Sequence, residues 1–401
     1  MENPTRRVGR FISELRHEGL PEEVRAALRR YFLDALGCGL YGYETPWGRT
    51  LSDYVAEAGG KPEATLWRAG SRAPAASVAL ALGTMIHSFE LDDYHSGAKL
   101  HPGAAVWGAA LPLAERLSAD GRRLAQAAAA GYEVVIRASL AAGSVAVRRR
   151  GFHLTGICGT FGAAAACANL LGLDPERTTN ALGIAGAQSA GIFAFIADGA
   201  NTKRFHAGRA AQSGLMAAEL AGRGFTGSTE VFEFEDGGFL QAFSGGGEAA
   251  ALTREMGERW ELLGVSHKPY ACCGSIHSTL DAVRELRARR ALRPEEVEEV
   301  KVFNSSVVKL QCSWPYQPAT PMNAQMNIEF CTALMLREGR ADPGGFTPER
   351  IADPELVALA RRVKFTVDPQ IDAIYPSAFP GKVAIRLKGS RRSSGSSRRG
   401  S

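Results

Sequence analysis

Hydrophobic residues along the first 260 or so positions recur every three or four residues, a spacing that predicts helices. The segment 21–42 begins with a proline and two acidic residues and ends in glycines, as helices commonly do. Further helices are predicted over 77–91, 101–117 and 209–224, where alanine and glycine are frequent. Because these side chains are small, we expect the helix axes to approach one another closely.

The pattern changes after about residue 262. Segments 295–308 and 382–389 alternate between apolar and polar residues, which predicts strands, and segments 274–292 and 326–339 keep the helical spacing. The expected fold is therefore mainly α, with a large all-helical domain followed by a smaller α+β domain. The expected boundaries are 1–262 for the helical domain, 263–388 for the α+β domain and 389–401 for a tail of serine, glycine and arginine that is predicted to be disordered.

Charge and hydropathy exclude two classes of partner. The net charge is +5, but the tail holds four arginines and no acidic residue, so removing their charge leaves +1 for the rest of the chain. A body so near neutrality gives no reason to expect nucleic-acid binding. No apolar run reaches the length of a membrane span, and the N-terminus lacks the apolar core of a signal peptide. We therefore expect no membrane association.

Cysteine and glycine spacing gives no sign of a metal or cofactor. Seven cysteines without a framework spacing predict free thiols in a reducing, cytoplasmic setting. Cys272 and Cys273 are adjacent, and the absence of a CxxC pair argues against structural zinc and iron–sulfur clusters. Gly156, Gly159 and Gly162 recur inside an alanine-rich helical pattern, which indicates helix packing rather than phosphate binding. This spacing therefore gives no sign of a structural zinc site, an iron–sulfur cluster or a phosphate-binding loop.

The stretch 87–102, HSFELDDYHSGAKLHP, crowds three histidines and three carboxylates into sixteen residues. Helical spacing places His87, Glu90 and Leu91 on one helix face, with Asp92 and Asp93 at the C-terminal end. Carboxylates there oppose the helix dipole and require compensation. The pattern alone leaves three explanations open: a polar network that caps and ties two helices, a metal site, or an acid–base site.

Cationic side chains recur in short glycine-bearing loops near predicted helix starts. Pro102 keeps His101 out of helical geometry and places it at a loop–helix junction. Helix N-termini combined with cations make binding sites for carboxylates. The other groups of this kind are His153; Lys203, Arg204 and His206; and His267, Lys268 and His277.

Four long motifs in this order resemble the MmgE/PrpD family, which contains 2-methylcitrate dehydratase, cis-aconitate decarboxylase and iminodisuccinate epimerase. They are HSFELDDYHSGAKLHPGAAVWGAALPLAE, GFHLTGICGTFGAAAA, TKRFHAGRAAQSGLMAAELAGRGFTG and KPYACCGSIHSTLDA, and the resemblance runs from about residue 8 to about residue 387. It implies an all-helical domain with a smaller α+β lid, a site in the cleft between them, a homodimer, and no metal or iron–sulfur cluster.

The resemblance also implies which residues form the site. The family's acidic motif matches Glu90, Asp92 and Asp93, its HP motif matches His101, and its GFH motif matches His153. The lysine before its H-x-G motif falls on Lys203, and the lid motif supplies a lysine and a histidine. The implied catalytic residues are Asp93, His101, His153 and His277; the implied substrate-binding residues are Glu90, Asp92, Lys203, Arg204 and Lys268.

These groups suit the removal of a hydrogen α to a carboxylate, which needs a positioned base and cations that stabilise the enediolate. Lys203 and Lys268 would hold substrate carboxylates, and His101 or Asp93 would take the proton. His153 or His277 would then protonate a leaving hydroxyl. We expect a cofactor-independent lyase acting on a di- or tricarboxylate, similar to 2-methylcitrate dehydratase. Decarboxylation or epimerisation would use the same groups.

Several positions depart from the family pattern. Glu90 stands where aspartate is common, Tyr94 where a small hydroxyl residue is frequent, and Phe330 where many members carry tyrosine. Family chains also continue beyond the strand predicted at 382–389, whereas this sequence passes into SRRSSGSSRRGS. These departures leave a second hypothesis, a non-catalytic relative that binds a carboxylate or a protein partner.

Overall fold

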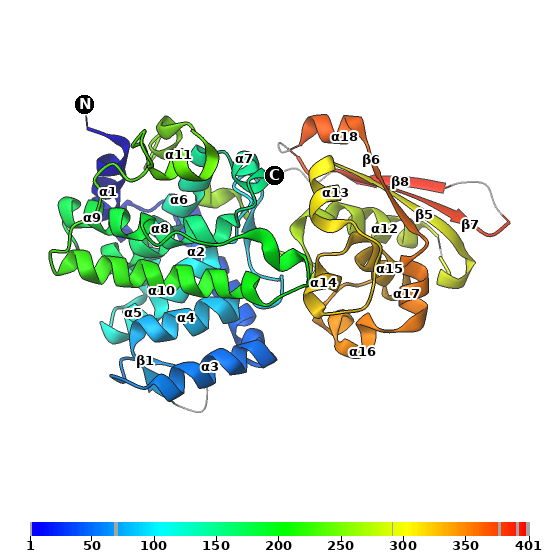
Figure 1. Cartoon of the computed structure of the whole chain (residues 1–401), viewed down its shortest axis with the longest axis horizontal. Coiled ribbons are helices and arrows are strands. Elements are labelled where there is room, and N and C mark those ends of the chain that lie inside the picture. Colours follow the sequence, from blue (N-terminus) through cyan, green and yellow to red (C-terminus); the bar gives the residue numbers. More distant parts are fainter. Residues whose placement is uncertain (1, 68–70, 291, 376–377, 390–392, 398–401) are drawn as a thin grey trace. The chain divides into compact units, whose positions relative to one another are not determined.

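The computed structural model describes residues 2–67, 71–290, 292–375, 378–389 and 393–397 (Figure 1). Contacts divide the chain into two units, which are described separately below. The first unit comprises Met1–Ser88, Asp92–Ala194 and Asn201–His267; the second comprises Phe89–Leu91, Phe195–Ala200 and Lys268–Ser401. The chain therefore leaves the first unit twice before its final passage after His267.

The first unit is built almost entirely of helices, as the hydrophobic spacing predicts. Its helices are α1 (Pro4–Glu14), α2 (Glu22–Tyr43), α3 (Pro46–Ala58), α4 (Ala75–Ile86), α5 (Pro102–Arg116), α6 (Gly121–Ala142), α7 (Ser144–Arg149), α8 (Leu154–Leu170), α9 (Pro175–Gly186), α10 (Thr202–Gly222) and α11 (Phe239–Ser244). Short antiparallel pairs join β1 (Ala64–Thr65) to β2 (Arg72–Ala73), and β3 (Tyr94–His95) to β4 (Val265–Ser266).

Small residues let the central helices touch along their backbones. Helix α8 is buried along its whole length, and α10 packs against both α4 and α8 (Figure 1). A Cβ atom on Gly83 would lie 2.9 Å from the Cα of Gly208, and one on Gly108 would lie 2.7 Å from the Cα of Gly83. Only glycine permits such an approach, so the predicted close packing of helix axes is confirmed.

The second unit contains a four-stranded mixed sheet in the order β6–β5–β7–β8. Strand β5 (Val297–Asn304) runs parallel to β6 (Val363–Val367) and antiparallel to β7 (Gly381–Leu387). Helices α12 (His277–Arg289) and α15 (Ile328–Glu338) pack against each other and against this sheet. The shorter helices are α13 (Ser306–Cys312), α14 (Pro321–Gln325), α16 (Pro348–Ile351), α17 (Pro354–Ala360) and α18 (Pro369–Ile374).

The mainly α fold with a smaller α+β part is confirmed, and two details differ from the sequence prediction. The strand expected over 295–308 ends at Asn304, because the Ser305 side chain accepts a hydrogen bond from the backbone N–H of Val308 and starts α13. Ser393–Ser397, within the tail predicted to be disordered, form β8 beside β7. Backbone pairing of this kind needs no apolar side chain, so composition alone did not indicate it.

The structure also bears on two expectations from the sequence, those on the cysteines and on membrane-spanning segments. None of the seven cysteines, each within the described part of the chain, forms a disulfide. In that same part, none of the helices combines the length and the apolar character that crossing a bilayer demands.

Candidate active site

The end of α4 is the first element of the site, and it differs from the prediction of a helix over 77–91. The helix stops at Ile86, and the hydroxyl of Ser88 donates to the carbonyl of Thr84. Glu90 then adopts a φ of 55°, in the left-handed region that non-glycine residues rarely enter. The prediction that His87, Glu90 and Leu91 share one helix face is therefore wrong, because the chain turns between them.

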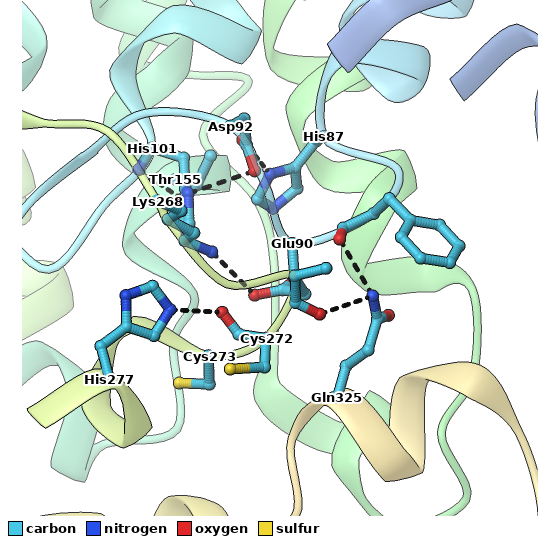
Figure 2. Close-up of polar contacts among 12 residues, drawn as sticks. His87, Glu90, Asp92, His101, Thr155, Lys268, Cys272, Cys273, His277 and Gln325 are labelled. Carbon is cyan, nitrogen blue, oxygen red and sulfur yellow. Dashed lines mark hydrogen bonds and ion pairs between the residues drawn. The ribbon is translucent and has the colours of Figure 1, made fainter. Parts of the chain in front are cut away.

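Asp92 and His87 form a buried carboxylate–imidazole dyad in the first unit (Figure 2). Nδ1 of His87 lies 2.6 Å from Oδ2 of Asp92. Burial lowers the pKa of His87 to about 3 despite the nearby carboxylate. Burial alone would raise the pKa of Asp92, but the neighbouring His101 and His87 hold it well below its usual range. The dyad at neutral pH is thus a carboxylate that accepts the Nδ1–H of a neutral imidazole.

This tautomer leaves the second nitrogen of His87 with its lone pair. Among the described atoms, the buried Nε2 of His87 has no hydrogen-bond partner. Buried polar atoms are nearly always satisfied, and the exceptions often serve function. The Nε2 atom is therefore the clearest candidate for a group that exchanges a proton with a ligand.

His101 occupies the N-cap position of α5, directly before Pro102, as the sequence predicts. Its Nδ1 donates to the backbone carbonyl of Asp93 over 3.0 Å and lies 3.4 Å from Oδ1 of Asp92. Because a carbonyl can only accept, Nδ1 carries the proton and Nε2 is again the basic nitrogen. The backbone N–H of His101 donates to Thr155 at the start of α8, which ties the two helix starts together.

His153 and His206 complete a group of four imidazoles in the first unit. His153 is the N-cap residue of α8, its ring stacks on His87 with centroids 5.7 Å apart, and its Nδ1 lies 3.1 Å from Nδ1 of His206. Burial lowers the pKa of His206 to about 4 and that of His153 well below its usual range. We call His87, His101, His153 and His206 the histidine cluster.

Lys203 supplies the positive charge beside this cluster. It lies buried in the first turn of α10, inside the helix rather than in the loop before it as the sequence suggested. Its charge contributes to the lowered pKa of both His87 and His206, so it lies near both rings. A buried cation among neutral imidazoles favours the binding of an anion.

Asp93 contacts a different set of groups from Asp92. Its carboxyl group accepts from the backbone N–H of Gly103 over 2.9 Å and from the hydroxyl of Tyr132 over 2.6 Å. Burial, with a further contribution from the charge of Asp34, raises the pKa of Asp93 to about 8. These contacts fasten the loop to the first turn of α5, which favours a structural role over the base expected from the family motif.

Arg204, expected to bind substrate, is engaged by the protein itself. Its Nε donates to the carbonyl of Ser88 over 2.6 Å, and Nη1 donates to Oδ1 of Asn201 over 2.7 Å. The guanidinium carbon lies 4.0 Å from the centre of the Trp47 ring. These contacts tie α10 to the end of α4, which favours a positioning role for Arg204.

The second unit holds a buried ion pair between Lys268 and Glu90 (Figure 2). Their Nζ and Oε2 atoms are 3.1 Å apart, and both side chains are shielded from solvent. Gln325 supports this arrangement by donating to the carbonyls of Phe89 and Ala271 over 2.9 and 3.0 Å. The ion pair and the amide together hold the segment Phe89–Leu91 in its turn.

His277 is the remaining predicted site residue, and it starts α12 in the second unit. Its Nε2 donates to the carbonyl of Cys272 over 3.2 Å, which leaves Nδ1 as the acceptor nitrogen. Among the departures from the family pattern, Tyr94 pairs with Ser266 in the β3–β4 ladder. Phe330 lies in the core against Tyr316, with ring centroids 4.6 Å apart.

Two members of the histidine cluster were not among the predicted site residues. His87 belonged to the quoted acidic stretch but was treated as a helix residue, and His206 was one of several cations near a helix start. Each stands in a motif that could have indicated it: His87 five residues before Asp92, and His206 three residues after Lys203. Their roles become visible only through ring contacts with His153.

The ligand atoms of His87, Asp92 and His101 lie within 4.8 Å of one another, close enough to meet one cation. Both Nδ1 atoms are already engaged, one by the Asp92 carboxylate and the other by the Asp93 carbonyl. Because Nδ1 of each ring carries a proton, its Nε2 is the nitrogen that can exchange a proton.

Comparison with known proteins identifies the relatives of this chain. Residues 6–251 match the model of the MmgE/PrpD N-terminal domain, and residues 270–398 match that of the MmgE/PrpD C-terminal domain. The cis-aconitate decarboxylase-like protein oryM of Aspergillus oryzae is 29% identical over 373 residues, which is 87% of this chain and 76% of that protein.

Two further relatives carry the name cis-aconitate decarboxylase. The protein from Aspergillus terreus is 26% identical over 403 residues, covering 96% of this chain and 82% of its own length. The protein from Homo sapiens is 29% identical over 361 residues, covering 87% of this chain and 74% of its own length.

Proposed function

The chain belongs to the MmgE/PrpD family and is a lyase, and we propose that it decarboxylates a small unsaturated tricarboxylate of the cis-aconitate type. The relatives described above support decarboxylation over the 2-methylcitrate dehydration expected first from the sequence. The observation that carries the proposal is the Asp92–His87 dyad, whose free Nε2 lies in a buried cluster beside Lys203.

Decarboxylation makes three demands on a protein. The bond between a carbon and its carboxylate breaks, CO₂ leaves, and the electron pair stays on the carbon until a proton forms the new C–H bond. Cations must hold the remaining carboxylates, an acid must supply the proton, and the charge must be stabilised away from bulk water. The first unit offers Lys203 for the first demand, the histidines for the second and a buried setting for the third.

Substrate binding itself would prepare the acid. His87 and His153 are neutral at pH 7, because burial lowers their pKa values. An anionic substrate placed beside them raises those pKa values, since an opposite charge stabilises the protonated imidazole. Asp92 contacts both His87 and His101, so we assign proton transfer to this pair. Within the first unit, Lys203 binds the substrate carboxylates. A direct role of Lys268, the other lysine expected to bind substrate, would require it to leave Glu90.

The proposed reaction is tested by offering the purified protein cis-aconitate, citrate, 2-methylcitrate and iminodisuccinate in D₂O and following each by NMR. With cis-aconitate we expect CO₂ release and one deuterium in the product, because the new C–H bond takes its hydrogen from solvent. Water loss from 2-methylcitrate without CO₂ release would instead establish a dehydratase. No turnover and no exchange with any compound would favour the non-catalytic relative.

Replacing Lys203 with alanine should weaken substrate binding. Losing one charge-assisted hydrogen bond costs about 1.5–3 kcal/mol, so KM should rise roughly 10- to 100-fold. Lys61, an exposed lysine of the first unit, gives the matched control Lys61→Ala, which should leave KM unchanged. Equal KM values for the two variants would remove Lys203 from the site.

We further propose a homodimer in the cytoplasm. The exposed apolar side chains Leu33, Leu40 and Tyr41 on α2 support self-association, and seven cysteines without a disulfide among them support a reducing compartment. Sedimentation velocity of the purified protein distinguishes the dimer from the monomer.

A further inference from the structure

Decarboxylation, on which this inference rests as the proposed function, consumes one proton in every turnover. The carboxylate leaves as CO₂, and the carbon keeps the bonding pair and gains a proton. A buried acid must therefore be recharged from solvent before the next turnover. The carboxylate of Asp92 and the ring of His87 are both shielded from solvent, so neither takes that proton directly.

The histidine cluster connects this buried dyad with the protein surface. His87 and His153 are buried, whereas His206 is half-buried. The ring of His87 stacks on that of His153, and Nδ1 of His153 lies 3.1 Å from Nδ1 of His206. One of those two nitrogens donates and the other accepts, so the pair already shares a proton.

Neighbouring backbone holds the two outer rings in this arrangement. The backbone N–H of His153 donates to the carbonyl of Gly191 over 3.0 Å. Gly191 has a φ of 140°, and a Cβ atom there would lie 3.3 Å from Nδ1 of His206. A Cβ atom on Gly156 would likewise lie 3.1 Å from the Cβ of His206. Both glycines therefore leave the space in which the His153–His206 contact forms.

We propose that His206 and His153 form a proton relay that recharges the His87–Asp92 dyad from solvent. His206 takes a proton on Nε2 and passes the one on Nδ1 to Nδ1 of His153, which releases its own proton from Nε2 to the bound anion beside it. The anion links the two stacked rings, because Nε2 of His87 accepts no hydrogen bond from His153 directly. Imidazole suits this role because it accepts a proton on one nitrogen and donates from the other. Each step moves a proton only, so no electron donor or acceptor is needed.

The charges around His153 and His206 disfavour a lasting protonated state of either ring, so a proton that reaches them is passed on. His153 faces the rings of His206, His87 and His101 and the cation of Arg148, while His206 faces Lys203. None of these named groups is a carboxylate, and Asp92 meets the histidine cluster through His87 and His101. Since cations destabilise a protonated imidazole, a proton on His206 or His153 moves on toward Asp92 or the bound anion.

The kinetic test replaces His206 with glutamine, which can hydrogen-bond but cannot carry a proton from one side to the other. We expect kcat for CO₂ release to fall at least roughly tenfold with KM unchanged, because acid–base groups contribute on the order of 10²–10⁴-fold. Added imidazole should restore much of the loss, and the solvent isotope effect on kcat should increase. His17→Gln, at a half-buried histidine outside the cluster, is the matched control.

An unchanged kcat in His206→Gln, or a loss that imidazole does not restore, would overturn the relay while leaving the decarboxylase assignment intact. A second measurement is independent of turnover. In ¹⁵N NMR of the histidine rings, Nδ1 of His153 and Nδ1 of His206 should share one proton, and the His153 signals should change in His206→Gln. Absence of the shared proton would overturn the relay even if cis-aconitate proved not to be the substrate.

Discussion

Asp92 determines which nitrogen of His87 is available for chemistry. Its carboxylate accepts the Nδ1–H of His87 and stays ionised, because the neighbouring imidazoles outweigh the effect of burial on its pKa. Asp93, one residue later, is surrounded by Tyr132, Gly103 and Asp34 and has its pKa raised. The pKa values of two adjacent carboxyl groups are thus shifted in opposite directions, which supports the proposed role of Asp92 as the partner of His87.

Replacing Asp92 with asparagine should lower kcat by roughly 10²- to 10⁴-fold with little change in KM. The amide presents an N–H where the carboxylate accepted one, so His87 would adopt the other tautomer and lose the lone pair on Nε2. Steady-state kinetics with cis-aconitate measure the effect, and circular dichroism verifies the fold. A folded Asp92→Asn variant with normal kcat would refute the dyad.

Replacing Asp93 with asparagine tests the neutral state of that carboxyl group. In the folded protein its pKa is raised from 3.8 to about 8, so its stabilising contribution is full below about pH 4 and is lost as pH rises toward 8. Asparagine does not ionise. We therefore expect Asp93→Asn to gain stability relative to the wild type between pH 5 and 8.5, measured by urea unfolding.

The same variant separates the two roles considered for Asp93. Retained activity of Asp93→Asn at pH 7 is expected from its structural contacts with Gly103 and Tyr132. A folded but inactive Asp93→Asn variant would instead support Asp93 as the catalytic base, the role that the family motif implies.

At the scale of the elements, the helix starts were predictable and one helix end was not. Proline and glycine are local signals, so the positions of His101 and His153 before α5 and α8 follow from neighbouring residues. Just after the end of α4, the carbonyl of Ser88 accepts a hydrogen bond from Arg204, which lies 116 residues later. Hydrophobic spacing within 77–91 carries no information about such a distant donor.

The close contact of α10 with α4 predicts that alanine substitutions at two glycines change the stability of the fold in opposite directions. A Cβ atom on Gly208 would overlap the carbonyl oxygen of Leu80 and the hydroxyl of Thr84, so Gly208→Ala should destabilise the fold by about 1–3 kcal/mol or more. Gly37 lies exposed in α2 with nothing within 4 Å of its Cβ position. Gly37→Ala should stabilise by about 0.5–1 kcal/mol.

Urea unfolding of the two variants beside the wild type measures both effects. Equal midpoints for Gly208→Ala and the wild type would show that the α4–α10 contact can relax by moving the helices apart.

At the scale of the whole molecule, the two units are not two consecutive halves of the sequence. The composition change near residue 262 suggested a single boundary, and the boundary at 262/263 stays a prediction. The second unit also takes Phe89–Leu91 and Phe195–Ala200 from earlier in the chain. Those segments supply the partners of Lys268, Gln325 and Thr320. Each of these segments is only a few residues long, so its composition could not indicate that it belongs to the second unit.

The fragment 268–401 expressed alone should therefore be much less stable than the same residues in the full chain. It leaves the ammonium group of Lys268 without Glu90, and breaking a buried ion pair costs about 3–5 kcal/mol. Gln325 and Thr320 also lose acceptors at Phe89 and Gly199. Trp314 is the one tryptophan of this fragment, so its fluorescence in urea reports the unfolding.

The expectation would be contradicted if the fragment unfolded cooperatively with the same urea midpoint, followed by Trp314 fluorescence, as the full-length chain. The comparison uses a full-length chain in which the other four tryptophans are replaced by phenylalanine, so that both signals come from Trp314.

The glycine contacts of α4, α5 and α10 also limit how such an enzyme can diversify. Where main chains touch, no enlargement of a side chain is accommodated, so mutational libraries aimed at these helices should yield mostly misfolded proteins. New substrate preferences, whether in nature or in laboratory evolution, would then arise in the short segments that flank the helices. Glu90 and Tyr94, which the sequence analysis interpreted as departures from the family pattern, lie outside the helices in one such segment.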